Sequence, residues 1–375
     1  MGKSYNAFSD DADALKAYGE IMSQLMENGQ PIKPELVIFA ADNKNFNFYS
    51  RRLALAYPRA TVIGSTNILI CSRRQYSETG VSVIAITDCL KVSAGIIMAV
   101  SRHPKRYVNS INKALDEFSS TRDLCCFEVN TSENGCEELL MDTFDSAIGK
   151  RNIPIVGYSA SKSRDGSERA LVSLNGEVYE EACIFAFIKN KNGRIGIFKE
   201  NMFKPSGHSF FTTDVDCEER RVYEYDGAPA AQMVSSALGI SVKRYIKDSF
   251  CYPMGRVEND DMTIISPKQV KEDGSIIYHS RIYNNTKMEL LEPKKSLTRV
   301  WRETAEAVDE AMNEISFCII INCYSRSDYF IEQGIMDEFV ENLDRNYPNY
   351  FGISCHGEQH DYKHHNETML VVAFE

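Results

Sequence analysis

The sequence predicts an α+β protein in which mixed sheets are flanked by helices and two modules are related by rough pseudo-symmetry. The prediction rests on a pattern that occurs three times: an apolar strand, a segment with helical spacing, a second strand that contains glycine, and a later returning strand. Chance rarely produces three copies in the same order, so we interpret them as duplicated units. The first strands span residues 36–39, 124–127 and 317–321, and the glycines are Gly64, Gly157 and Gly352.

The returning strands decide between the fold classes. They span residues 81–86, 182–187 and 369–374. Each needs an antiparallel neighbour, and the pair Asn175-Gly176, which suits the positive φ angles of a tight turn, predicts a hairpin in the second copy. A purely parallel, doubly wound sheet has neither feature, so we expect mixed sheets.

Helices are predicted between and around the copies. Residues 10–28 carry apolar side chains at helical spacing, with Ser9 or Asp10 available as the N-cap and Gly29 as the stop. A connector helix is expected over residues 105–120.

A domain boundary is expected near residue 205, because Pro205-Ser206-Gly207 marks a loop. The N-terminal module would span residues 1–204 and the C-terminal module residues 205–375. The second module begins with a weaker fourth copy and continues through a long helix at residues 296–315 into the last copy. The fourth copy comprises a strand at 222–225, a helix at 228–238 and strands at 262–266, 275–280 and 287–291.

Composition excludes several classes of protein. The chain of 375 residues has a formal net charge of -11, which argues against nucleic-acid binding because that needs a basic surface. No apolar run is long enough to span a bilayer and no signal peptide is recognisable, so we expect a cytoplasmic protein without a membrane span. The 11 cysteines include no CxxC pair, which indicates reduced, mostly buried thiols rather than disulfides or structural zinc.

Several short motifs follow one another along the chain. They are Gly157-Tyr158-Ser159-Ala160, Asn175-Gly176-Glu177-Val178-Tyr179, Tyr225-Asp226-Gly227-Ala228-Pro229-Ala230, Pro253-Met254-Gly255-Arg256, Asn322-Cys323-Tyr324-Ser325-Arg326, Gly357-Glu358-Gln359 and His365-Asn366-Glu367-Thr368. In this order they resemble the motifs of the FIST family (F-box and intracellular signal transduction), over residues 8–375. Tyr158 departs from the family, which often has a second glycine there. The resemblance implies an N-terminal and a C-terminal FIST module that form a signal-input domain for small molecules such as amino acids, or haem in some members. Relatives often carry a kinase or chemotaxis-receptor output region after these modules. Because this chain ends on its last strand, we expect a separate output protein.

The candidate ligand site lies at the strand ends of the third copy. Asn322, Cys323 and Arg326 follow one strand, and Ser354 and Glu358 follow the next, with His365 and Asn366 expected to close the rim. A guanidinium opposite a carboxylate suits a zwitterionic amino acid. The alternatives are that Arg326 and Glu358 pair with each other, or that Arg326 forms a surface or interdomain ion pair.

Several other residues could take part in catalysis, metal binding or anion binding, but each also has a simpler structural explanation. Cys323 or Cys355 with His356 or His360 would suit a cysteine-dependent hydrolase or transferase, but no oxyanion-hole or nucleophile-elbow motif accompanies them, so we expect no catalysis. The clustered histidines His356, His360, His364 and His365 could bind zinc or haem iron, or could be loop residues in water. His208 is a second candidate for haem. Ser65, Thr66 and Ser159 could bind an anion or satisfy their own turns. No cofactor is expected, with haem as the alternative.

Overall fold

The computed structural model describes residues 3–131, 135–258 and 261–375, and the chain divides into two compact units. The large unit comprises Met1–Glu200, Trp301–Tyr362 and Met369–Glu375. The small unit comprises Asn201–Val300 and Lys363–Thr368.

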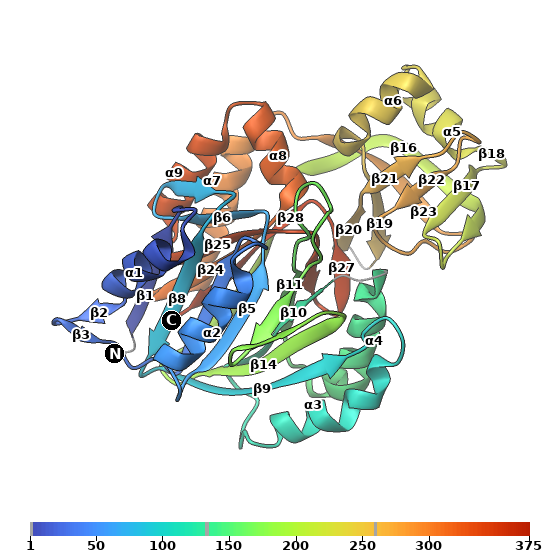
Figure 1. The fold of residues 1–375 in the computed structure, drawn as a ribbon. Coiled ribbons are helices and arrows are strands. Elements are labelled where there is room, and N and C mark those ends of the chain that lie inside the picture. The colour runs from blue at the N-terminus through green and yellow to red at the C-terminus, as the bar shows by residue number, and fades with distance from the viewer. Residues whose placement is uncertain (1–2, 132–134, 259–260) are drawn as a thin grey trace. The chain divides into compact units, whose positions relative to one another are not determined.

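The large unit contains the three predicted copies, which share one pairing pattern (Figure 1). In each copy, two strands connected through a helix run parallel, and the returning strand pairs antiparallel with the first of them. The first copy consists of β4 (Leu36–Ala41), α2 (Phe46–Ala56), β5 (Thr61–Thr66) and β8 (Val81–Thr87). The second consists of β10 (Leu124–Asn130), α4 (Glu137–Ile148), β11 (Ile155–Ser159) and β14 (Ala182–Asn190). The third consists of β24 (Phe317–Cys323), α8 (Tyr324–Glu332), α9 (Met336–Asn346), β25 (Tyr350–Cys355) and β28 (Thr368–Phe374). The α+β prediction of mixed sheets flanked by helices is confirmed.

Each copy also donates a strand to the sheet of another copy. The first copy donates the hairpin of β6 (Leu69–Ser72) and β7 (Gln75–Ser77) to β25, and the second donates the hairpin of β12 (Val172–Leu174) and β13 (Glu177–Tyr179) to β5. The third donates β26 (Glu358–His360) to β11. The exchange is cyclic, so no copy can complete its sheet alone. A further strand borders each returning strand: β1 (Lys3–Ser9), β9 (Leu90–Met98) and β15 (Ile195–Asn201).

The repeated glycine is explained by close packing between the parallel strands. Gly64 lies opposite Phe39, and a Cβ atom at Gly64 would come within 2.1 Å of the Phe39 ring. Gly157 lies opposite Glu128, and a Cβ atom there would come within 2.2 Å of the Glu128 carbonyl oxygen. A side chain at either position would therefore have to displace its neighbour.

The inner faces of the three sheets share one hydrophobic core, to which Ile38, Phe127 and Ile319 belong. The outer faces pack against helices. On the first sheet these are α1 (Ala14–Gln24) and α2, and on the second α3 (Val108–Leu115) and α4. On α7 (Leu297–Ala311), Trp301 packs against Phe330 of α8, with ring centroids 5.6 Å apart. Burying each such side chain stabilises the fold by about 1.5–3 kcal/mol.

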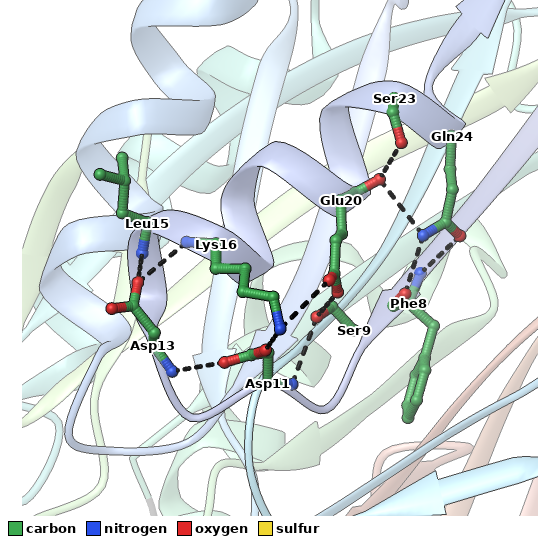
Figure 2. Close-up of polar contacts among 9 residues, drawn as sticks. All are labelled: Phe8, Ser9, Asp11, Asp13, Leu15, Lys16, Glu20, Ser23 and Gln24. Atoms are coloured by element: carbon green, nitrogen blue, oxygen red, sulfur yellow. Dashed lines mark hydrogen bonds and ion pairs between the residues drawn. The ribbon is translucent and has the colours of Figure 1, made fainter.

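The leading helix is shorter than predicted because its N-cap is Asp13 rather than Ser9 or Asp10. The Asp13 carboxylate accepts from the backbone N–H groups of Leu15 and Lys16, each at 2.9 Å (Figure 2). The expected stop, Gly29, instead forms the turn between β2 (Met26–Glu27) and β3 (Gln30–Pro31), with φ of 74°. The predicted Asn175-Gly176 turn is confirmed, with φ angles of 51° and 90°.

The connector helix of residues 105–120 is split into a 3₁₀ turn, η1 (Pro104–Tyr107), and α3. Proline at the start of η1 fixes φ and lacks an N–H donor, which suits the first helical position.

The described part of the small unit is built from antiparallel strands, the helices α5 (Ala230–Ala237) and α6 (Val242–Asp248), and a 3₁₀ turn, η4 (Ser249–Cys251). Its strands are β16 (Phe203–Asp216), β17 (Arg221–Tyr225), β18 (Ala228–Pro229), β19 (Met254–Glu258), β20 (Asp261–Ile265), β21 (Pro267–Val270), β22 (Ile276–Tyr278), β23 (Lys287–Pro293) and β27 (Lys363–His365). The prediction of a fourth copy is wrong. Its elements exist, but β17 pairs antiparallel with both β16 and β22, so the parallel pair that defines a copy is missing from the described residues.

Candidate functional site

The carboxyl ends of the glycine strands meet in a group of buried polar side chains, which we call the polar centre. It consists of Ser65, Asn67, Asn130, Tyr158, Ser159, Ser354, Cys355, Glu358 and Gln359. The Tyr158 hydroxyl lies 2.7 Å from Ser65 Oγ, which donates to Asn67 Oδ1 at 2.7 Å. Asn67 Nδ2 in turn donates to the Ser354 carbonyl oxygen at 3.1 Å. These bonds join the second copy to the first and the first to the third.

Tyr158 has a structural role that glycine could not fill. Burial raises the pKa of the Tyr158 phenol, and the hydrogen bond with Ser65 acts in the opposite direction. The phenol is therefore neutral and available as a donor inside the core.

A second chain of hydrogen bonds leads from the third copy to a buried carboxyl group. Gln359 donates to Ser159 Oγ at 3.1 Å, and Ser159 donates to Asn130 Oδ1 at 3.2 Å. Asn130 Nδ2 and the Cys183 thiol then donate to Glu128, each at 3.2 Å to Oε2. Burial raises the pKa of Glu128 to about 8, although these two hydrogen bonds oppose the shift. Glu128 is therefore a protonation site inside the core.

Four of the predicted ligand residues lie together at the strand ends of the third copy. In the sheet register, Asn322 lies opposite Ser354, and Cys323 lies opposite Cys355. Asn322 Nδ2 donates to Ser327 Oγ at 2.9 Å, and Ser327 Oγ lies 2.6 Å from Ser354 Oγ. The Cys355 thiol donates to Glu358 at 3.3 Å. These side chains are buried, so they do not form an open wall that a ligand could reach directly.

Arg326 has a partner that the sequence did not indicate. It lies in the first turn of α8, and its guanidinium forms an ion pair with Glu200 of β15, with both side chains 0% exposed. It also donates to the Glu200 carbonyl oxygen at 3.4 Å, and it stacks over the Phe330 ring at 5.6 Å. Neither Glu358 nor a surface acid is the partner in this pair.

His365 and Asn366 belong to the small unit, where they are buried. Asn366 Oδ1 accepts from the Ser266 backbone N–H at 3.2 Å and from Ser280 Oγ at 3.0 Å. Ser266 Oγ donates to the neighbouring carboxylate of Glu367. The motif His365-Asn366-Glu367 thus organises polar contacts within the small unit.

An accessible pocket lies at the strand ends of the first copy, and sequence reasoning missed it. This strand-end pocket has a volume of about 230 Å³ and is lined by Ala12, Asp42, Asn43, Lys44, Asn45, Asn67, Ile68, Glu78, Thr79, Ser163, Arg164 and Glu168. Asp42 directly follows β4, and Asn67 directly follows β5. The polar run Asp42 to Asn45 after an apolar strand was the available signal, since ligands often bind at carboxyl ends of parallel strands.

The pocket contains charges of both signs held in fixed positions. Arg164 lies 2.7 Å from Glu78 and makes two hydrogen bonds to the carboxylate of Asp328, at 3.0 and 3.1 Å. Asp42 accepts from the backbone N–H groups of Gly80 and Asn45, at 2.8 and 2.9 Å. These contacts connect the pocket to all three copies, because Asp328 lies on α8.

Ala12 forms part of the wall of the strand-end pocket, and the hydrogen bonds and ion pairs around the N-terminus of α1 stabilise this wall (Figure 2). Asp11 accepts from the Asp13 backbone N–H at 2.9 Å and forms an ion pair with Lys16. Ser9 Oγ donates to Glu20 at 2.6 Å. The loop before α1 is thus held to the helix from both sides.

Comparison with known proteins supplies the family. A model of the FIST N domain matches residues 35–228, and a model of the FIST C domain matches residues 230–361. The chain belongs to the FIST family. FIST domains are sensory domains of signal transduction. The family predicted from the sequence is therefore confirmed, and so is the general sensory role that the resemblance implied. Among curated proteins, no match to the chain was found at the significance required.

The Cys355 thiol of this FIST chain is poorly suited to nucleophilic attack. Burial raises the pKa of the Cys355 thiol well above its usual value, with the nearby Glu358 carboxylate adding to the effect. The reactive thiolate is therefore disfavoured. His356, one of the suggested bases, lies with its ring against Tyr324, with centroids 4.7 Å apart.

Within the described ranges of this FIST chain, no group of three or more His, Cys, Asp or Glu side chains is placed to hold a metal ion. In the same part of the chain, no helix has the length and apolar character needed to cross a bilayer.

Proposed function

We propose that this FIST protein is a small-molecule sensor whose strand-end pocket binds an amino acid or a similar zwitterionic metabolite. One observation carries the proposal. Asn67 lines the pocket, while its side chain is hydrogen-bonded into the polar centre that the three copies share. A ligand that contacts Asn67 therefore acts on the contact between copies.

The charges of the pocket favour a zwitterion. The Arg164 and Glu78 side chains are 45% and 52% exposed, so a ligand can reach both. Its carboxylate would replace Glu78 on the guanidinium, and its ammonium group would take the place of the guanidinium beside Glu78. Asp328 would hold Arg164 in position during this exchange. The volume of about 230 Å³ is below the range of roughly 300–1,000 Å³ typical of drug-sized ligands, which suits a ligand as small as an amino acid.

Signalling follows from a shift between two conformations. A ligand can move this equilibrium only by binding one state more tightly than the other, and the Asn67 contacts supply that difference. We propose that a separate output protein, of the kinase or chemotaxis type, reads the change. No catalytic turnover is part of the proposal.

The residues predicted from sequence remain the competing placement of the ligand. That set is Asn322, Cys323, Arg326, Ser354, Glu358, His365 and Asn366. The two placements differ in one respect that can be measured, because Arg164 and Asn67 contact the ligand only in the first.

A thermal-shift screen of the common amino acids tests the proposal. We expect at least one of them to raise the melting temperature, and we expect its N-acetyl and carboxamide derivatives to lose the effect, because each lacks one charge. If the N-acetyl and carboxamide derivatives raised the melting temperature as much as the amino acid does, recognition of a zwitterion would be contradicted. Purified protein with a Soret absorption band would instead favour the alternative, a haem-based gas sensor.

A further inference from the structure

The hairpin donated by the first copy ends in an unusual turn. Ser72 pairs with Gln75, so the turn consists of only Arg73 and Arg74, with φ angles of 46° and 64°. Two-residue turns of this geometry favour Asn-Gly, because both central residues need positive φ. A pair of arginines is unfavourable there, so the turn holds backbone strain that Asn-Gly would avoid.

The two arginines line a second pocket, which we call the hairpin pocket. It has a volume of about 490 Å³ and is lined by Asn6, Arg73, Arg74, Asp344, Tyr347, Pro348, Asn349 and Tyr350. Arg74 Nε lies 2.8 Å from Asp344 Oδ2, so that charge is balanced. Within residues 3–131, 135–258 and 261–375, the Arg73 guanidinium has no ion pair or hydrogen bond, and the pocket therefore has an excess positive charge.

Two buried polar groups of the hairpin pocket also have atoms that could form a further hydrogen bond. Asn6 is 3% exposed, and its Nδ2 donates to the Tyr350 carbonyl oxygen at 2.8 Å, which fixes the orientation of the amide. Its Oδ1 has no hydrogen-bond partner in the described part of the chain, and the same is true of the Tyr347 hydroxyl. Buried polar atoms are rarely left unpaired, so both call for a ligand or an ordered water.

We infer that the hairpin pocket binds a small metabolite with a phosphate or carboxylate group and a nearby hydroxyl or ammonium donor. The Arg73 guanidinium has the planar set of donors that such an anion needs. Asn6 Oδ1 is an acceptor, so it requires a donor on the ligand rather than a second anionic oxygen. This site differs from the strand-end pocket, and β6 (Leu69–Ser72) connects the two, since Asn67 and Ile68 precede the strand and Arg73 follows it.

The test compares ligands and variants by calorimetry on the full chain. The probes are inorganic phosphate, glycerol 3-phosphate, glycerate and glycerol, which separate the anion from the donor. In the double variant Arg73→Asn/Arg74→Gly the turn has its favoured residues but lacks both guanidinium groups. Arg59→Ala, which removes an exposed arginine elsewhere, is the matched control.

We expect glycerol 3-phosphate or glycerate to bind the wild type and Arg59→Ala equally, and the double variant at least about tenfold more weakly, as loss of a charge-assisted contact predicts. The double variant should also melt at a higher temperature without ligand, which would show that it is folded. Asn6→Ala should weaken the hydroxylated probes but leave inorganic phosphate unchanged. Unchanged affinity in the double variant, or no binding of any anionic probe to the wild type, would overturn the inference.

Discussion

Asn67 and Ser354, 287 positions apart in the chain, are joined by a hydrogen bond of 3.1 Å from the Asn67 side chain to the Ser354 carbonyl oxygen. Asn67 is only 2% exposed, yet it lines the strand-end pocket. Ser354 lies at the end of β25 in the third copy, whereas Asn67 follows β5 in the first. One side chain thus connects the accessible pocket to the contact between two copies.

Replacing Asn67 with alanine tests this connection. The substitution removes the donor to the Ser354 carbonyl oxygen and the acceptor of the Ser65 hydroxyl, while Ser65 keeps its contact with Tyr158. We expect the free energy of unfolding to fall by about 1–3 kcal/mol, as for a buried polar group that loses its hydrogen bond. Denaturant titration measures the change, and a loss below about 0.5 kcal/mol would show that this bond contributes little.

The ion pair between Arg326 and Glu200 predicts a contrast between two variants. Arg326→Ala leaves a buried carboxylate without its partner, which should lower the free energy of unfolding by about 3–5 kcal/mol. The double variant Glu200→Gln/Arg326→Met removes both charges and keeps most of the volume, so it should be clearly more stable than Arg326→Ala. Equal stability of the two variants would mean that the buried charge is not the cause.

Glu128 predicts that stability falls as pH rises. Its pKa is about 8 in the folded protein, against an ordinary value of 4.5, so between these values the folded state holds a proton that the unfolded state releases. Its contribution is therefore complete below about pH 4.5 and is lost as pH rises to about 8, with a size on the order of a few kcal/mol.

Glu128→Gln should remove this part of the pH dependence, because glutamine keeps the shape without titrating. Urea unfolding at pH 5, 7 and 9 gives the comparison, with the exposed Glu332→Gln as control. If Glu128→Gln and the wild type show the same pH profile, Glu128 is not the titrating group.

The packing around the glycines of the three copies predicts how strongly alanine at each position changes the free energy of unfolding. Gly64→Ala and Gly157→Ala should lower the free energy of unfolding by about 2 kcal/mol or more, because the added Cβ overlaps Phe39 or Glu128. Gly352→Ala should have a smaller effect, since its nearest neighbour is Cys71 Cβ at 3.0 Å. Gly19→Ala, in an exposed turn of α1 with open space around it, should stabilise by about 0.5–1 kcal/mol. Thermal or denaturant unfolding of the four variants measures the order, and a reversed order would refute the packing argument.

Local patterns were enough to predict the three copies. An apolar strand, a helical spacing and a glycine are each encoded within a few residues, and the same holds for the Asn175-Gly176 turn. The exchange of hairpins was not predictable in this way, because β6 has no local feature that distinguishes β25 from β5 as its partner.

The same reasoning explains the outcome at the site. The strand-end residues Asn322 and Ser354 were placed together because parallel neighbours end at the same edge of a sheet. The partner of Arg326 was missed because Glu200 lies 126 positions away in the chain and is not part of a recognisable motif. The strand-end pocket was missed because its walls come from segments of the first and second copies, and only the fold brings Asp42 and Arg164 together.

The most direct test of the account is the affinity of the best amino-acid ligand for four proteins, measured by calorimetry. The proteins are the wild type, Arg164→Ala, Glu358→Gln and the control Arg59→Ala. The strand-end pocket predicts at least about tenfold weaker binding to Arg164→Ala alone, as removal of a charge-assisted contact requires. Equal affinity of the wild type and Arg164→Ala, with loss of binding in Glu358→Gln, would contradict this site and favour the strand ends of the third copy.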